Sequence, residues 1–170
     1  MRTHFLIAIL LAFALPAFAE GENNGYAVMK VNHEFLNDAG ETHSEIGDLT
    51  AKARYQQTLE KSGKYTGIRF IVHWKAPSSG IANFVVKIEA RGLDAGSQKE
   101  NIQTLLKTYP RSESSSGWEF MDITDDTLKR FGKLMAWKVT LLSDGKPMAE
   151  RHSFMWDDTI LGTEKTTETK

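Results

Sequence analysis

The fold is decided by residues 68–74, which read IRFIVHW, and by residues 84–90, which read FVVKIEA. In both stretches every second side chain is apolar, and most side chains between them are polar or β-branched. A period of two places alternate residues on opposite faces of a strand, so one face of each stretch can enter a core. Residues 77–80, Pro-Ser-Ser-Gly, separate the stretches and have the composition of a loop. The sequence therefore predicts two half-buried strands that follow one another along the chain.

The same alternation predicts further strands on both sides of this pair. Stretches of this kind are residues 26–36, 102–106, 118–123, 135–141 and 148–156. The dipeptide Asp144-Gly145 lies between the last two and can supply the positive φ angles of a tight hairpin. Residues 122–130 are polar and predict a short helical turn. Seven or eight short strands with hardly any helix predict an all-β fold, an antiparallel sandwich.

Residues 48–60 are the ambiguous segment of the chain. Apolar side chains alternate with polar ones from Leu49 to Tyr55, which favours a strand. The segment is also rich in alanine, and Asp48 could cap a helix. The period of two makes a strand the preferred interpretation here, and a helix stays as the alternative.

The closing hairpin resembles the last two strands of immunoglobulin-like and fibronectin-III-like sandwiches. The resemblance is architectural, covers residues 60–157 and includes no family motif. The Cys-Trp-Cys core of immunoglobulin domains is absent, because the chain contains no cysteine. The resemblance implies an immunoglobulin-like or fibronectin-III-like architecture and assigns no functional residue.

Residues 1–19 have the pattern of a cleavable secretory signal peptide. An uninterrupted apolar run at residues 5–15 is followed by Ala-Phe-Ala at residues 17–19, a small-residue site of the kind that signal peptidase cleaves. The run is too short for a transmembrane helix, which needs about 20 residues. We therefore expect a signal peptide, a sandwich domain at residues 20–158, and a polar tail at residues 159–170 that could be disordered.

Composition narrows the location and the kinds of partner. The chain has no cysteine and no Asn-x-Ser/Thr site, which favours the periplasm of a bacterium, or secretion from one, over a eukaryotic secretory route. Without the leader and its Arg2, 20 basic side chains stand against 22 acidic ones, mixed along the chain. Such a balance argues against a nucleic-acid partner and against a surface for anionic membranes. After cleavage of the leader we expect no insertion into a membrane.

No recurring catalytic arrangement is present in the sequence. It contains no Gly-x-Ser-x-Gly elbow, no phosphate-binding loop and no dinucleotide fingerprint. The paired acids Asp125-Asp126 and Asp157-Asp158 are neighbours in sequence, whereas a glycosidase needs two carboxyl groups across a cleft. We therefore expect a non-catalytic protein without a cofactor.

Histidine and methionine give the alternative of a periplasmic copper- or zinc-binding protein. Thioether sulfur suits Cu(I), and imidazole suits zinc and copper. His33 and His43 flank a predicted turn, and Met148 and His152 would share one face of a strand. Candidate metal ligands are His33, His43, Met148 and His152. Their spacing matches no short metal-binding motif, so core packing is the simpler interpretation of the methionines.

Tryptophans and their neighbours give the last signal. Trp137 shares a predicted face with core residues, whereas Trp118 and Trp156 lie at predicted strand ends, where a ring could contact a protein or a sugar. His73 and Lys75 would face away from the core. The predicted partner-binding residues are His73, Lys75, Trp118 and Trp156.

The preferred function is an exported, non-catalytic component of the cell envelope, an adaptor or assembly protein that binds another envelope or extracellular protein. Metal binding is the first alternative, and carbohydrate binding or hydrolysis is the second.

Overall fold

A computed structural model of the chain describes residues 25–42, 48–77, 83–94, 96–110 and 115–157. The expected signal peptide, His43 and the tail at residues 159–170 lie outside the described residues. The described strands are β1 (Ala27–Leu36), β2 (Gly67–Lys75), β3 (Asn83–Leu93), β4 (Glu100–Pro110), β5 (Ser116–Thr124), β6 (Lys133–Ser143) and β7 (Lys146–His152). The helices are α1 (Leu49–Ser62), α2 (Asp125–Phe131) and the single 3₁₀ turn η1 (Phe154–Trp156). No helix in this part of the chain has the length and apolar character needed to cross a membrane.

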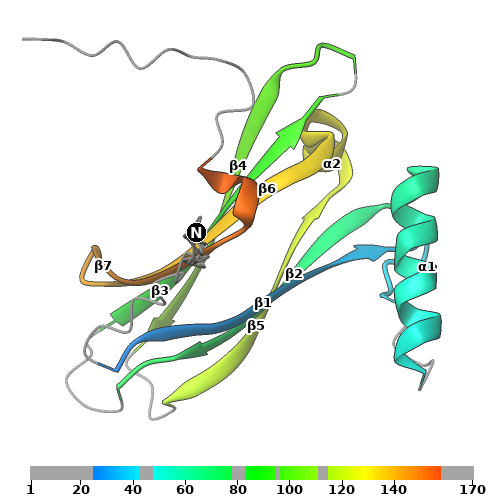
Figure 1. Ribbon diagram of the computed structural model, residues 1–170. Helices are drawn as coiled ribbons and strands as arrows, with labels where there is room; N and C mark the ends of the chain where they lie inside the picture. The colour runs from blue at the N-terminus through cyan, green and yellow to red at the C-terminus, as the bar shows by residue number, and fades with distance from the viewer. Residues whose placement is uncertain (1–24, 43–47, 78–82, 95, 111–114, 158–170) are drawn as a thin grey trace, which may run out of the picture.

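The strands form two sheets that pack face to face (Figure 1). One sheet has the order β1-β2-β5 and the other the order β4-β3-β6-β7. Every neighbouring pair is antiparallel. The predicted all-β antiparallel sandwich is therefore confirmed.

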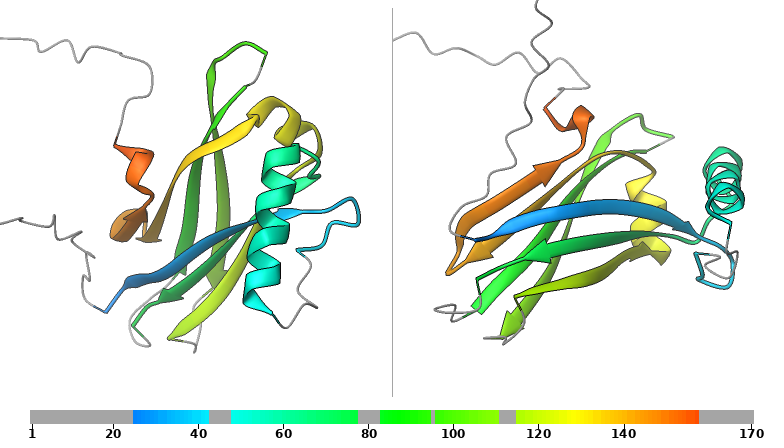
Figure 2. Two further views of the ribbon diagram at one scale, coloured as in Figure 1. Left: turned by 45° about the vertical axis from the view of Figure 1, so that its right-hand side comes forward. Right: turned by 60° about the horizontal axis from the view of Figure 1, so that its bottom comes forward.

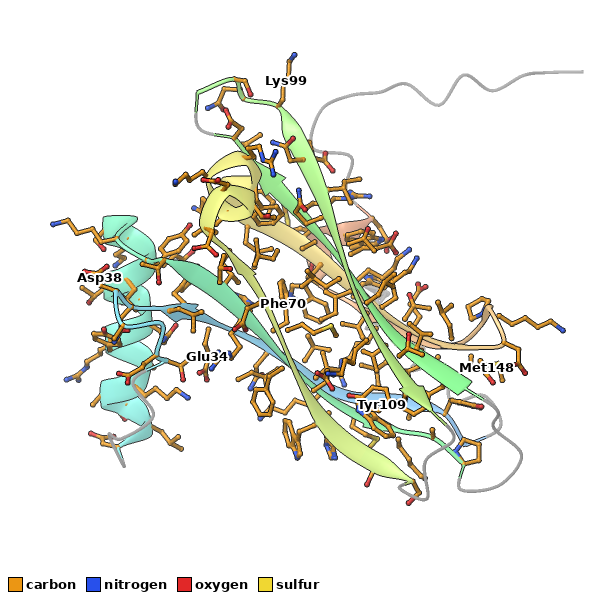
Figure 3. The ribbon with its side chains drawn as sticks, turned by 180° about the vertical axis from the view of Figure 1, so that it is seen from behind. Glu34, Asp38, Phe70, Lys99, Tyr109 and Met148 are labelled. Atoms are coloured by element: carbon orange, nitrogen blue, oxygen red, sulfur yellow. The ribbon has the colours of Figure 1, made fainter. Side chains whose placement is uncertain are left out.

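The core lies between β2 and β3, which come from the two stretches that decided the fold. The buried side chains are Ile68, Phe70, Val72 and Trp74 of β2 and Phe84, Val86, Ile88 and Ala90 of β3. These are the alternate residues that the sequence assigns to one face. The two strands do not pair, because the connection between them crosses from one sheet to the other. Figure 3 shows Phe70 between the two layers, where burial of a large apolar side chain contributes about 1.5–3 kcal/mol.

The preferred interpretation of residues 48–60 as a strand is wrong, because these residues form most of α1. The Asp48 carboxylate accepts a hydrogen bond from the backbone N–H of Thr50 at 2.8 Å and so caps the first turn. The helix ends at Gly63, whose φ is 64°. Tyr55 and Leu59, four residues apart, pack against the core from one side of the helix. Capping and alanine content outweighed a short run of alternation.

The predicted hairpin is present, but its return strand is shorter than expected. Asp144 and Gly145 have φ angles of 49° and 76°, as a type I′ turn requires, and they join β6 to β7. β7 ends at His152 and not at residue 156. Ser153 then exchanges hydrogen bonds with the backbone of Trp137, and the chain turns into η1.

Candidate functional site

A groove of about 420 Å³ opens between α1 and the edge of β1. Residues 31–34 of β1 form one wall, and Leu49, Lys52, Ala53 and Gln56 of α1 form the opposite wall. Trp137 of β6 completes the lining. The right view of Figure 2 shows α1 outside the two layers, beside the end of β1 that leads toward it. The helix thus converts the side of an edge strand into a concave surface.

Gln56 closes one end of the exposed edge of β1. Its Nε2 donates to the carbonyl of Phe35 at 3.1 Å, and its Oε1 accepts from the N–H of Phe35 at 2.5 Å. The amide therefore pairs with Phe35 as a neighbouring strand would. Because alternate residues of a strand direct their backbone groups to the same side, the N–H and C=O groups of Val31 and His33 also point away from β2.

Arg151 of β7 closes the other end of this edge. Its Nη1 donates to the carbonyl oxygens of Val28 at 3.3 Å and Met29 at 2.5 Å, where a register shift interrupts the pairing of β1 with β2. Between Arg151 and Gln56, no described residue pairs with the outer edge of β1. Residues 30–34 therefore form a short open edge, and the groove lies along it.

The groove combines apolar surface with one unsatisfied acceptor. Leu49 is 83% exposed and Ala53 is also exposed, so α1 presents apolar atoms to solvent here. Lys52 forms an ion pair with Glu34, in which Nζ of Lys52 lies 2.6 Å from Oε1 of Glu34. Figure 3 shows Glu34 on the α1 side of the sheet. The other oxygen of Glu34, Oε2, is buried, and no group in the described part of the chain hydrogen-bonds to it. A buried acceptor of this kind favours a ligand that brings a donor.

His33 lies in the groove with its ring against two phenylalanines. The ring meets Phe35 edge-on at 5.9 Å and lies 6.4 Å from Phe70. Burial lowers the pKa of His33 below its ordinary value of 6.5, while the carboxylates of Glu60 and Glu34 act in the opposite direction. The lowered pKa favours the neutral imidazole, which adds an uncharged surface to the groove.

The lowered pKa of His33 predicts that the fold becomes less stable in mild acid. The unfolded chain binds the proton more tightly than the folded chain, so stability is complete above pH 6.5 and falls between 6.5 and the lower folded pKa. We expect the urea midpoint to drop between pH 7.5 and pH 5.0, and His33→Gln to reduce that drop. An unchanged drop in the variant would contradict the assignment to His33.

The Gln56 contact predicts a second measurable effect. Gln56→Ala removes both hydrogen bonds to Phe35 and leaves its backbone groups without this partner. We expect a loss of about 1–2 kcal/mol in the free energy of unfolding and faster amide exchange at Phe35. The neighbouring Gln57 is exposed on the same helix, so Gln57→Ala is the matched control and should change neither quantity. Equal effects of the two variants would rule out the edge-capping role.

Three of the four predicted partner-binding residues share one surface. His73 of β2 and Trp118 of β5 stack with ring centroids 4.4 Å apart and planes 7° from parallel. Lys75 lies two residues beyond His73 on the same face of the β1-β2-β5 sheet. Trp156 lies elsewhere, because η1 places its ring 4.2 Å from Cζ of Arg91, on the outer face of the other sheet.

The structure does not bring the candidate metal ligands together within the described residues. His33 lies in the groove, Met148 packs against the core, and His152 lies opposite Lys138 on the outer face of β6 and β7. The expected shared face of Met148 and His152 is wrong, because a register shift beside Leu142 inserts Met148 as an extra residue and interrupts the alternation. No cluster of three or more His, Asp or Glu side chains that could hold a metal occurs among the described residues.

The groove itself was not predicted from the sequence. It depends on α1, whereas the sequence favoured a strand over residues 48–60. It also depends on Trp137, which the sequence placed on the same face as core residues. Trp137 does pack against the core, but it also lines the groove. The Asp48 cap and the alanine content of the segment were the local signals that could have indicated a helix beside β1.

Comparisons with known proteins assign no family to this chain. No family model matches it, and no curated protein matches it. Among solved structures, a protein from Akkermansia muciniphila is similar at 12% identity and a TM-score of 0.49, over 75% of this chain and 68% of that chain. An identity this low gives no basis for transferring a function.

Proposed function

We propose that this chain is an exported, non-catalytic binding domain that holds an extended segment of a partner protein along the open edge of β1. The observation that carries the proposal is the position of the groove. It follows the part of β1 that lies between the caps made by Arg151 and Gln56, where the backbone has no partner among the described residues. The signal-peptide pattern of residues 1–19 supports export, with the bacterial periplasm or the extracellular space as the proposed location and an envelope or extracellular protein as the proposed partner.

Strand addition explains how such a groove would work. A partner segment would form backbone hydrogen bonds with Val31 and His33, which supply affinity without regard to sequence. Its alternate side chains would point to opposite faces. One set would meet the apolar groove surface that includes Trp137 and Ala53, and a donor beside it would satisfy Oε2 of Glu34. The expected partner segment is therefore extended, with an apolar side chain close to a Lys, Arg, Ser or Thr.

Catalysis in the same groove has less support. His33 and Glu34 are the titratable groups that could act as a pair, but adjacent residues of a strand point to opposite faces. Glu34 is already paired with Lys52. A binding role uses the backbone edge directly and needs no such pair.

The finer architecture is part of the same proposal. We infer an immunoglobulin-like or fibronectin-III-like sandwich, because β1-β2-β5 and β3-β6-β7 follow the orders of the A-B-E and C-F-G strands of constant-type immunoglobulin domains. In this chain β4 pairs with β3 and not with β5. A crystal structure of the mature domain, with strand order and register determined, would test this inference.

Peptide selection followed by mapping would test the proposed function. A displayed library of random ten-residue peptides would be selected on the immobilised mature domain, and the selected peptides titrated into ¹⁵N-labelled protein. We expect the largest shifts at the amides of Val31 and His33 and at the indole N–H of Trp137. Ala53→Arg places a long side chain in the groove and should weaken binding at least about tenfold, a loss of about 1.4 kcal/mol.

A matched variant separates occlusion of the groove from a general effect of charge. Thr58 is exposed on the same helix and is not part of the groove lining, so Thr58→Arg adds the same charge and should leave binding unchanged. The proposal fails if no peptide is selected, if the shifts map to another surface, or if the two arginine variants weaken binding equally.

A further inference from the structure

The two sheets have four edge strands in the described part of the chain, and β4 differs from the other three. The edge strands are β1, β5, β4 and β7. β1 is capped by Gln56 and Arg151, and β7 contains Pro147 and a register shift. β5 carries the carboxylates of Glu119 and Asp122. Caps, prolines, bulges and charges of this kind are what protect sheet edges against pairing with another chain.

The middle of β4 carries none of these protections. Residues 102–106 read IQTLL, without a charged side chain or a proline. The pairing of β4 with β3 shows no register shift over the 11 residues of the strand. Ile102 and Leu106 lie on the outer face of the sheet, opposite Arg91 and Lys87, and are 57% and 62% exposed. A regular, uncharged edge with two exposed aliphatic side chains favours pairing with another strand.

The backbone of this stretch is oriented for such pairing. The N–H of Asp94 donates to the carbonyl of Lys99 at 3.0 Å, one position beyond the first pair of the β3–β4 ladder. Hydrogen-bonded and non-hydrogen-bonded pairs alternate along an antiparallel ladder, so this bond fixes the phase for the whole strand. The N–H and C=O groups of Ile102, Thr104 and Leu106 therefore point away from β3, and no described residue pairs with them.

The sequence of β4 is complementary to itself in one antiparallel register. A two-fold axis at Thr104 places Thr104 of two copies opposite each other, and Ile102 of each copy opposite Leu106 of the other. These three residues have the outward-pointing backbone groups, so about six backbone hydrogen bonds would join the strands. Moving the axis by one residue places Leu106 opposite Glu100 or Thr104, and the aliphatic side chains no longer meet.

The charges of β4 also allow this register. Glu100 and Lys107 are the charged residues of the strand. In the register centred on Thr104, Glu100 faces Thr108 of the other copy, and Lys107 faces Asn101. Like charges directly opposite one another would destabilise the pair, and this arrangement contains none.

From these observations we propose that the protein forms a two-fold dimer in which β4 pairs with β4 of a second copy, centred on Thr104. The two four-stranded sheets then become one continuous sheet. Figure 3 labels Lys99 and Tyr109, near the two ends of this strand. Self-complementarity favours a second copy over an unrelated strand. Because a two-fold contact uses the same strand in both copies, assembly stops at two.

The dimer is independent of the proposed function. β4 lies on the β5 side of the sandwich, where Nζ of Lys107 is 4.0 Å from Oε1 of Glu119. The groove lies along β1, at the opposite edge of the β1-β2-β5 sheet. A dimer through β4 would therefore leave both grooves open.

Single cysteines test the register directly, because the chain has no cysteine of its own. In the proposed dimer the two Thr104 residues form a hydrogen-bonded pair with Cα atoms about 5.5 Å apart, a separation that a disulfide can span. We expect the mature Thr104→Cys protein to form a covalent dimer on mild oxidation. Thr108→Cys is the matched control, also exposed on β4. Its two copies would lie about 25 Å apart and should form no covalent dimer.

Charge pairs across the interface give a second test, by sedimentation of the mature protein. In the variant Ile102→Lys, Leu106→Lys the register sets lysine opposite lysine, and the dimer dissociation constant should rise at least about tenfold. In Ile102→Lys, Leu106→Glu the same register sets lysine opposite glutamate, and the dimer should be retained. Phe120→Lys changes an equally exposed residue of β5, 57%, and should leave the dissociation constant unchanged. Thermal unfolding of each variant confirms that it is folded.

Four results would overturn the proposal. They are an unmodified protein that stays monomeric up to about 1 mM, equal cross-linking of Thr104→Cys and Thr108→Cys, equal dissociation constants for the two charge-pair variants, and a dimer that Phe120→Lys dissociates. The last result would assign the dimer to the outer face of β5. Peptide titration of the variant Ile102→Lys, Leu106→Lys should give unchanged binding in the β1 groove, so failure of this proposal and failure of the groove proposal are distinguishable.

Discussion

Replacing Phe70 with alanine is expected to lower the free energy of unfolding by about 3–5 kcal/mol. Phe70 has no exposed surface and lies in the middle of β2, between the two layers. Removing its ring loses the free energy gained by transferring those atoms from water to the core. It also leaves a cavity that the close-packed neighbours fill only in part. Urea unfolding followed by tryptophan fluorescence would measure the loss as a lower midpoint with an unchanged slope.

Phe120 provides the matched control for this prediction. It is the same residue type on the adjacent strand, but it is 57% exposed on the outer face. Phe120→Ala should therefore change the free energy of unfolding by no more than about 0.5 kcal/mol. Similar losses in the two variants would mean that the face assigned to Phe70 is not the buried one.

Replacing Gly92 with alanine is expected to cost about 3 kcal/mol or more. Gly92 lies on β3, where a Cβ atom would come within 2.2 Å of the backbone oxygen of Phe131 and 2.8 Å of its ring. Phe131 is the last residue of α2 and is completely buried, so neither the backbone of β3 nor the end of α2 can move aside without disturbing the core. We expect a large drop in melting temperature or a failure to fold.

Gly96 gives the corresponding control. A Cβ atom there would meet only a side-chain oxygen of Asp94, at 3.5 Å, in an exposed turn. Gly96→Ala should therefore leave the melting temperature almost unchanged. If Gly92→Ala had the same melting temperature as Gly96→Ala, the close approach of α2 to β3 described above would be wrong.

The parts of the fold that follow local rules could be predicted from the sequence. Alternation identified the buried faces of β2 and β3, and Asp144-Gly145 identified the turn between β6 and β7, because both signals act over a few residues. Residues 48–60 were misassigned for the same reason. A run of alternating side chains and a capped alanine-rich helix compete over one short window, and packing of Tyr55 and Leu59 against the core supports the helix.

The candidate site depended on contacts that no local pattern contains. Trp137 reaches the groove from a strand about one hundred residues after β1, and Arg151 caps β1 from β7. The convergence of His73 and Trp118 was partly accessible, since alternation placed His73 on an outer face. Their stacking required the β2–β5 register. Trp156 was misplaced because the chain leaves the strand at Ser153, where its backbone N–H bonds to the carbonyl of Trp137.

The two side-chain caps on β1 also limit how a second copy of the protein could pair through this strand. A long bare edge strand invites open-ended stacking, in which each added strand offers a new edge to the next molecule. Gln56 and Arg151 leave only residues 30–34 open, a length of about 17 Å. A short flexible segment can enter that interval, but a long rigid strand of a neighbouring sandwich cannot. The same contacts that bound the proposed peptide site would therefore protect the β1 edge against open-ended pairing with other copies of the chain.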